Sequence, residues 1–188
     1  MYVFEMVRLE LVWYRGLALG FPATILRATL ETFAFARRLM LEGAVSLSVE
    51  TVSAILAGGG FAIDAMFIIM VKPCDTLSRE IPDSDVCLFV DDLAVLVVGK
   101  EDQVQAMVTK VIDRSIELLE DELGLKVSRK KTMVAASSWR LAKKLKAKLQ
   151  KQGIGVKPNA KLLGVDFSCG KRVARVTQAE RVRKVKVR

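Results

Sequence analysis

Between residues 22 and 41 apolar side chains recur every three or four positions, which is typical of a helix that buries one face. Pro22 suits the first turn of such a helix, where its missing N–H is not needed. Gly43 is a common residue just beyond a helix end. The segment 44–49 then alternates apolar and polar residues, as a half-buried strand does. The sequence therefore predicts a helix over 22–41 followed by a short strand over 44–49.

Three consecutive glycines, Gly58, Gly59 and Gly60, precede a second apolar stretch. Glycine supplies conformations that a tight turn needs, so the triplet predicts a flexible turn. The residues after it predict a helix over 61–77, which Pro73 kinks or ends early.

The stretch 54–71 is apolar and long enough to resemble a membrane span. The glycines interrupt its first part and Asp64 lies at its middle. A charge at the centre of a bilayer costs roughly 3 kcal/mol, even on a lenient scale. We therefore interpret it as a buried strand-turn-helix unit and expect no membrane-spanning segment.

Two short runs rich in β-branched residues, 86–90 and 93–98, flank the dipeptide Asp91-Asp92. Such runs around a two-residue polar break predict a buried β-hairpin. A helix over 101–123 should follow, because acidic residues at its start complement the helix dipole and Gly124 provides a stop.

The C-terminal third predicts a strand over 132–136, a strongly basic helix over 139–152, and a last strand pair over 162–167 and 172–176. The expected fold class is α/β (α+β). We expect a small antiparallel sheet with helices packed on one face, covered by the helices that end near residues 41 and 123. The acidic dipeptide should lie at the open edge of a cleft.

Composition narrows the possible chemistry. The 188 residues suit one domain, or one domain with a tail, and 52% hydrophobic residues suffice for a core. Histidine is absent, which excludes Ser-His-Asp and Cys-His catalytic sets, HExxH zinc sites and Cys2His2 fingers. Three widely spaced cysteines without a CxxC pair argue against a disulfide framework or structural zinc, and favour a reducing compartment.

The net charge of +9 conceals a division along the chain. Residues 1–125 carry a net charge of −9, whereas residues 126–188 carry 20 basic and two acidic side chains, a net charge of +18. This asymmetry points to a polyanion or an acidic membrane surface as partner of the C-terminal third. A solvated tail that binds nothing in particular is the alternative.

The dipeptide Asp91-Asp92 is the most informative candidate for chemistry. Two carboxylates among apolar neighbours are costly to bury unpaired. An arginine partner, exposure at the turn, or a divalent metal would each offset that cost. Oxygen ligands suit Mg²⁺, and two such ions can hold the attacking and leaving oxygens in phosphoryl transfer. Because aspartate is common in turns, a simple exposed turn is the competing interpretation.

Four sequence blocks, in order, resemble motifs of reverse transcriptases, in particular those of non-LTR retrotransposons. The central block is FVDDL, residues 89–93, which is similar to the [YF]-x-D-D motif C. ILAGGGFA (55–62) resembles the glycine segment before the motif B helix, GLKVSRKKT (124–132) resembles motif D, and LLGV (162–165) resembles the start of motif E. The resemblance covers roughly residues 16–170.

This resemblance implies a reverse-transcriptase palm that acts on an RNA template, a DNA primer and dNTPs. Residues 1–170 would form a partial domain with motifs B to E, and 171–188 would form a basic C-terminal extension or the start of a thumb. Asp91 would be a ligand of catalytic Mg²⁺ (or Mn²⁺), and Asp92 would support that metal site. Phe89 and the three glycines would lie beside the nucleotide and template.

The resemblance also implies roles for lysines. Lys131 would lie near the nucleotide phosphates and could donate a proton to the leaving pyrophosphate; otherwise it is a solvated lysine in a basic loop. Phosphates of the template-primer would be neutralised by the basic helix, in a salt-sensitive manner. The lysines concerned are Lys143, Lys144, Lys146 and Lys148. Alternatively, these lysines only solvate the outer face of the helix.

Several features depart from the family pattern. No aspartate precedes Asp64, although motif A supplies a metal-binding aspartate, and residues 1–5 resemble only the tail of that motif. No glutamine accompanies the glycines, and the fingers and a full thumb are lacking. We therefore expect an N-terminally truncated RNA-directed DNA polymerase fragment that is weak or inactive alone, because the motif A aspartate is missing.

Two other functions remain open: a non-catalytic nucleic-acid-binding remnant, and a basic peripheral membrane protein that uses helix 139–152. The family suggests an intracellular location, nuclear or cytoplasmic.

Overall fold

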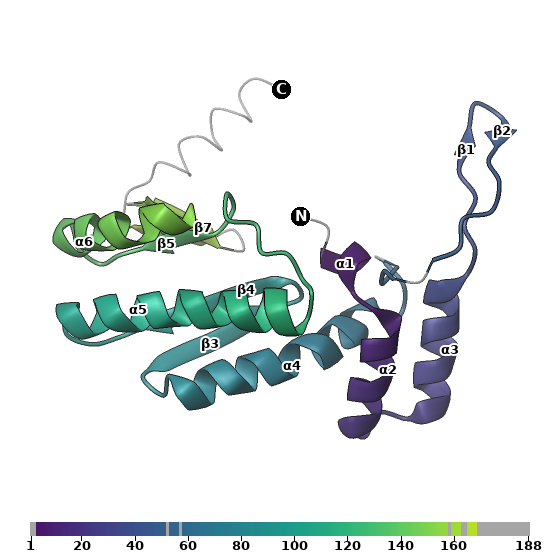
Figure 1. The fold of residues 1–188 in the computed structure, drawn as a ribbon, viewed down its shortest axis with the longest axis horizontal. Helices are drawn as coiled ribbons and strands as arrows, with labels where there is room; N and C mark the ends of the chain where they lie inside the picture. Colours follow the sequence, from purple (N-terminus) through teal and green to yellow (C-terminus); the bar gives the residue numbers. More distant parts are fainter. Residues whose placement is uncertain (1–2, 52, 57, 158, 163–164, 169–188) are drawn as a thin grey trace. The chain divides into compact units, whose positions relative to one another are not determined.

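The computed structural model describes residues 3–51, 53–56, 58–157, 159–162 and 165–168 (Figure 1). The chain divides into two compact units. The first comprises Met1–Val98 and Val111–Val127, and the second comprises Gly99–Lys110 and Ser128–Arg188. The predicted boundary between a domain and a basic extension, at residue 170, lies outside the described residues.

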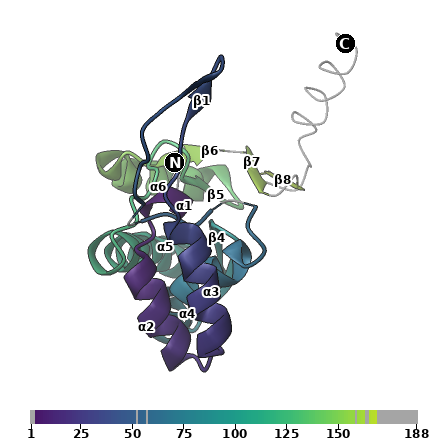
Figure 2. The same ribbon diagram turned by 90° about the vertical axis from the view of Figure 1, so that its right-hand side faces the viewer.

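Three helices form the core of the first unit: α2 (Leu9–Ala18), α3 (Ala23–Ala34) and α4 (Ala62–Glu80). Helix α2 packs against both α3 and α4, and Figure 2 shows α2 and α3 side by side. Their facing side chains are fully buried, including Val12, Leu26, Phe33, Met66 and Ile69. Burying one such side chain stabilises the fold by about 1.5–3 kcal/mol.

The described chain begins with a helix and not with an extended segment. A single-turn helix, α1 (Val3–Met6), precedes α2, so residues 1–5 do not continue a strand in the part that the structure describes. Sequence reasoning predicted neither helix. The apolar residues of α2 do recur at helical spacing, and buried Val12 and Gly16 lie one turn apart on its inner face.

Helix α3 ends seven residues earlier than predicted, because Phe35 adopts an extended conformation. The chain then forms a hairpin of β1 (Met40–Leu41) and β2 (Ala44–Val45), which extends from the end of α3 (Figure 1). Glu42 and Gly43 both have positive φ, as a two-residue hairpin turn requires. Gly43 is therefore a turn residue and not a helix stop.

The predicted strand over 44–49 is correspondingly wrong, because only two of its residues pair as a strand. All described residues from 38 to 50 are exposed, including Leu39 at 72% and Leu47 at 89%. The apolar periodicity of this segment thus does not correspond to burial. Helical spacing forms a stable helix only where another surface covers the apolar face.

The prediction of a helix after the glycines is confirmed, and α4 extends to Glu80 with Pro73 inside it. Pro73 does not end the helix, which continues for seven residues beyond it, and the Pro73 side chain is buried. The residues before the glycines are bound to the N-terminal segment by backbone hydrogen bonds and not by a full strand. Ile55 N–H donates to the carbonyl of Phe4 at 2.7 Å.

Strands β3 (Ser84–Phe89) and β4 (Asp92–Val97) pair antiparallel, which confirms the predicted hairpin. The turn, however, consists of Val90 and Asp91, and Asp92 already belongs to β4. The observed and predicted registers differ by two residues, so both place the same side chains on each face. Apolar alternation therefore could not distinguish them.

The predicted helix over 101–123 is confirmed as α5 (Glu101–Ile116), continued by a π-helical segment, η1 (Glu117–Glu122). Gly124 ends it with a φ of 69°. Leu123 and Leu125 then enter the core of the first unit. Strand β3 packs against α4, whereas α3 packs against α2, so the predicted coverage of the sheet by the helix over 22–41 is wrong.

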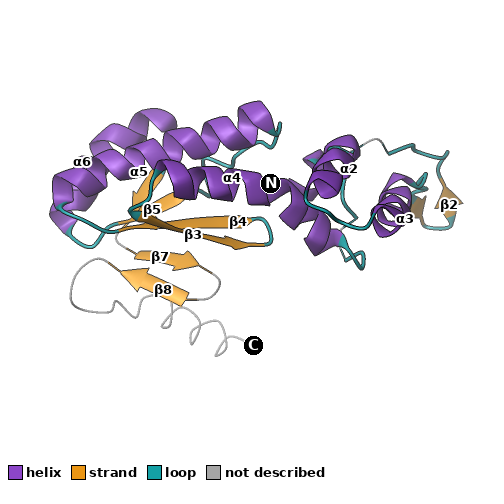
Figure 3. Ribbon diagram, turned by 90° about the horizontal axis from the view of Figure 1, so that it is seen from below, coloured by secondary structure: helices purple, strands orange, loops and turns teal. Residues whose placement is uncertain are grey.

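In the second unit, β5 (Met133–Ala135) and β6 (Gly155–Lys157) pair in parallel. Helix α6 (Trp139–Leu149) connects them and continues into a 3₁₀ turn, η2 (Gln150–Gln152). It packs against β6. Figure 3 shows α6 (purple) and β5 (orange). The predicted strand over 132–136 and basic helix over 139–152 are confirmed.

Strands β7 (Asn159–Leu162) and β8 (Val165–Ser168) form an antiparallel pair. The single strand predicted over 162–167 is therefore the end of β7 and the beginning of β8, and its predicted partner, 172–176, lies outside the described residues. Among the described residues the strands form four two-stranded sheets, one of them parallel, rather than a single antiparallel sheet. The mixture of helices and short strands agrees with the α/β class.

Candidate functional site

The turn of the β3–β4 hairpin carries an unusual backbone conformation. Val90 has a φ of 57°, in the left-handed region that β-branched residues rarely adopt. Such a residue costs about 1–3 kcal/mol and persists only where the surroundings hold it. The half-buried Val90 side chain packs against the core of the first unit and thereby anchors the turn beside Asp91.

The two carboxylates occupy different positions on this hairpin. Asp91 is the second turn residue, and Asp92 is the direct cross-strand partner of Phe89. Because side chains alternate along a strand, Phe89 and Asp92 share one face of the hairpin, opposite to half-buried Leu88 and Leu93. Phe89, Asp91 and Asp92 are all exposed. This face can meet a ligand without rearrangement.

Neither aspartate side chain forms an ion pair or hydrogen bond with any described residue. An arginine partner, exposure at the turn or a divalent metal could each offset the cost of the two charges. No arginine pairs with them within the described chain, and both side chains are exposed. The described residues also include no group of three or more acidic, histidine or cysteine side chains suited to a metal. The pair fits an Mg²⁺ ion whose other ligands are water and substrate phosphates, but it does not form a complete protein site.

The three glycines turn the chain into α4, in the same unit as the hairpin. Gly58 has a φ of 86°, which explains glycine there. A Cβ on Gly59 would approach the carbonyl oxygen of Leu56 to 3.1 Å and the ring of Phe33 to 3.2 Å. A Cβ on Gly60 would meet no atom within 4 Å. Local structure thus accounts for two of the three glycines, and Gly60 has open space around it.

Lys131 belongs to the second unit, whereas Asp91 and Asp92 belong to the first. It lies in the turn before β5, where its backbone N–H donates to the carbonyl of Ser128 at 3.0 Å. Its side chain is exposed.

Helix α6 separates apolar and basic side chains. Ser138 caps its N-terminus by accepting a hydrogen bond from the backbone N–H of Leu141 at 3.2 Å. Leu141, Leu145 and Leu149 are buried within the second unit. Lys143, Lys146 and Lys148 are exposed and form no ion pair with the described residues.

Lys144 has a different environment from these three lysines. Its Nζ lies 3.0 Å from Oδ1 of Asp102 and 3.3 Å from Oε1 of Glu101, at the start of α5. Arg140 donates to the same Glu101 carboxylate. Hydrogen bonds from Arg140 and then Lys144 lower the pKa of Glu101, and the hydrogen bond from Lys144 lowers the pKa of Asp102.

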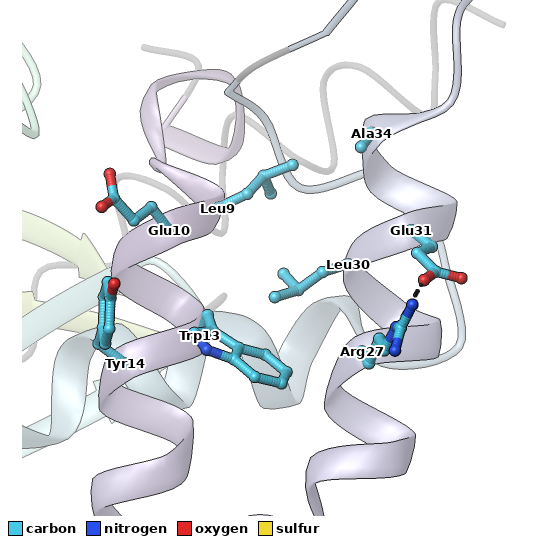
Figure 4. A pocket seen from close by; sticks show the side chains of 8 residues that line it. All are labelled: Leu9, Glu10, Trp13, Tyr14, Arg27, Leu30, Glu31 and Ala34. Atoms are coloured by element: carbon cyan, nitrogen blue, oxygen red, sulfur yellow. Dashed lines mark hydrogen bonds and ion pairs between the residues drawn. The ribbon is translucent and has the colours of Figure 1, made fainter.

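A groove of about 490 Å³ between α2 and α3 was not predicted (Figure 4). Trp13 and Leu30 point toward one another across it, and an ion pair between Arg27 and Glu31, at 2.9 Å, lies on its rim. Leu9 and Trp13, four residues apart, could have indicated this face from the sequence.

Comparison of the chain with protein-family models, with curated proteins and with solved structures gave no match. Among the described residues, no helix combines the length and the apolar character that crossing a membrane requires. A functional proposal therefore rests on the residues and their geometry.

Proposed function

We propose that this chain is a partial palm domain of an RNA-directed DNA polymerase, in which the β3–β4 hairpin holds an Mg²⁺-bound nucleotide. The observation that supports it best is the hairpin turn. An anchored turn presents two adjacent carboxylates, without an ion pair in the described part of the chain, beside an exposed aromatic ring. The order of glycine turn, helix, acidic hairpin and helix also agrees with the resemblance of the sequence blocks.

The reaction would be attack of a primer 3′-hydroxyl on the α-phosphate of a nucleotide, with pyrophosphate as leaving group. When bound, divalent ions would stabilise the charge that develops on the phosphate. Asp91 and Asp92 would position those ions. Phe89, on the same face as Asp92, would provide an apolar contact for the nucleotide.

We expect the isolated chain to be a weak polymerase or none. Two-metal catalysis depends on positioned charge, and no third carboxylate accompanies the pair among the described residues. A missing ligand that costs about 3 kcal/mol of transition-state stabilisation lowers the rate by roughly 100-fold.

A second candidate function is a non-catalytic nucleic-acid-binding remnant. The observation that favours it is the +18 charge of residues 126–188, together with the exposed lysines of α6 that have no ion pair with any residue the structure describes. A peripheral membrane role for α6 is less compatible with its environment. Its apolar face packs within the second unit and is not available to a bilayer.

Primer extension tests the proposal. A DNA primer on an RNA template is incubated with dNTPs and Mg²⁺ or Mn²⁺, and the chain is compared with Asp91→Asn. Asp85→Asn is the matched control, because Asp85 is exposed on the same strand pair but distant from the turn. We expect weak extension that falls at least tenfold in Asp91→Asn only.

Equal extension by the chain and Asp91→Asn would contradict the proposed site. Strong extension by the isolated chain would instead show that the expected weakness is wrong. No extension by any variant, together with salt-sensitive binding of the RNA–DNA hybrid, would favour the binding remnant. Mn²⁺ binding in the presence of a dNTP, followed by electron paramagnetic resonance, would test Asp91 and Asp92 independently of turnover.

A further inference from the structure

The basic side chains of α6 divide into two groups that differ in their partners. Arg140 and Lys144 are held by the carboxylates of Glu101 and Asp102. These ion pairs and the buried leucines fix the rotation of the helix within the second unit. The positive charge on that side of α6 is largely neutralised by the acidic start of α5.

The other side of α6 carries Trp139, Lys143 and Lys146, which we call the Trp139 stripe. Their spacing of four and three residues places them on one line along the helix. The line is about 10 Å long, at 1.5 Å per residue. The Trp139 side chain is 69% exposed, and the two lysines form no ion pair with the described residues.

This combination of groups has a specific chemistry. Tryptophan is a large apolar side chain that is mostly buried in folded proteins, so an exposed ring marks a candidate contact surface. Aromatic rings on which bases stack, next to cations that follow the backbone, characterise single-strand nucleic-acid sites. The +18 charge of residues 126–188 adds long-range attraction for such a polyanion.

Two other partners fit less well. A bilayer would require an apolar helix face, but Leu141, Leu145 and Leu149 are buried within the unit. A nucleic-acid duplex covers the faces of its internal bases by stacking, so the ring of Trp139 would find a free base only at its ends. An unpaired strand offers both base faces and phosphates.

We infer that the Trp139 stripe is a binding site for single-stranded nucleic acid. The ring of Trp139 stacks on an unpaired base, and Lys143 and Lys146 contact the phosphates next to it. This inference rests on the proposed function for the class of ligand, but it requires neither Asp91 nor a metal. Lys144 takes no part, because its charge is already paired.

Fluorescence provides a direct test, because the chain has only two tryptophans, Trp13 and Trp139. In the full-length variant Trp13→Phe, emission reports on Trp139 alone. We expect a single-stranded 12-nucleotide DNA without label to quench this emission, whereas the corresponding blunt duplex quenches it much less. The converse variant, Trp139→Phe, should show little quenching.

Affinity for a fluorescein-labelled single strand gives an independent measurement. Trp139→Ala should raise Kd by roughly 10-fold, within the range that stacking of one base supports. The double variant Lys143→Gln, Lys146→Gln should reduce the slope of log K against log salt by about 1.4. Lys157→Gln, at an exposed lysine of β6 to which no nucleic-acid contact is assigned, is the matched control and should change Kd less than twofold.

Several outcomes would overturn the inference. One is single-strand binding with no quenching and no effect of Trp139→Ala, which would place the ligand elsewhere and leave the proposed polymerase function intact. Equal quenching by duplex and single strand would exclude base stacking. Quenching by phosphatidylserine vesicles but not by DNA would identify a membrane surface instead. Primer extension by Asp91→Asn tests the proposed function separately, so the two failures are distinguishable.

Discussion

The guanidinium of Arg15 donates a hydrogen bond, 2.7 Å long, to the backbone carbonyl of Ile69. That carbonyl lies four residues before Pro73 in α4, so it is the acceptor that the missing N–H of proline leaves without a helical partner. A side chain from α2 thus satisfies a buried backbone group in α4. Burial lowers the pKa of Arg15 from its ordinary value.

This relationship predicts that Arg15 and Pro73 are energetically coupled. Arg15→Met should lower the free energy of unfolding by about 1.5–3 kcal/mol, because a buried carbonyl loses a charged donor. In a Pro73→Ala background the alanine N–H can donate to Ile69, so the same change should cost clearly less. Urea unfolding of the four chains gives the coupling energy. Equal effects of Arg15→Met in both backgrounds would contradict the assignment.

The conformation of Val90 predicts that Val90→Gly and Val86→Gly lower the free energy of unfolding by different amounts. Val86→Gly should cost about 1.5–3 kcal/mol, because it removes a half-buried side chain from a strand with ordinary φ. Val90→Gly removes a similar side chain but also releases the left-handed strain, so its cost should be about 1–2 kcal/mol smaller. Urea midpoints measure both, and equal losses would show that Val90 is not strained.

The environments of the glycines predict that Gly58 is needed for stability, whereas Gly60 is available for contact with a ligand. Gly58→Ala should lower the free energy of unfolding by about 1–2 kcal/mol, because its φ of 86° is unfavourable for alanine. Gly60→Ala should change it by less than about 0.5 kcal/mol, since the added methyl meets nothing. If the nucleotide approaches this turn, Gly60→Ala should nevertheless weaken dNTP binding. Unchanged dNTP affinity would argue against contact at Gly60.

The ion pairs between α5 and α6 predict a loss of stability in acid. Arg140 and Lys144 lower the pKa of Glu101, and Lys144 lowers that of Asp102. A carboxyl whose pKa is lowered by folding stabilises the fold at any pH above its ordinary pKa, which is 4.5 for Glu101. This contribution to the free energy of unfolding is lost as the pH falls through the folded-state pKa. The double variant Glu101→Gln, Asp102→Asn should therefore be less stable than the parent at pH 7.

At low pH the parent and this double variant should converge in stability, because the parent carboxyls are then protonated as well. Thermal unfolding monitored by circular dichroism between pH 2.5 and 7 would measure the difference. The difference should also shrink in high salt, since exposed ion pairs are screened. A gap that is independent of pH would show that the two acidic side chains contribute through packing and not through charge.

Local patterns were sufficient for most helices and for the acidic hairpin. The helices that became α4, α5 and α6, the strand β5 and the glycine stop at Gly124 were all expected from spacing and turn chemistry. These features depend on contacts between residues three or four apart, or on the conformation of one residue. Such information is present in the sequence itself.

The register of the hairpin and the end of α3 required the tertiary structure. A shift of two residues leaves every β3 and β4 side chain on the same face, so alternation could not reveal that Val90 enters the turn. Likewise, Leu39 and Met40 continue a helical spacing beyond Ala34, but both side chains are exposed and no described residue covers them. Helical periodicity describes what a segment could bury and not what lies opposite to it.

The sequence by itself determined the candidate chemistry of this protein: two adjacent aspartates between apolar strands, a glycine turn before a helix, and a basic helix near the C-terminal end. The tertiary structure decided which of these groups have partners. It paired Lys144 with Glu101 and Asp102, gave Lys143 and Lys146 no ion pair among the described residues, and brought Arg15 to the carbonyl of Ile69. The physical reason is that partners distant in the sequence meet only when packing selects one face of each helix.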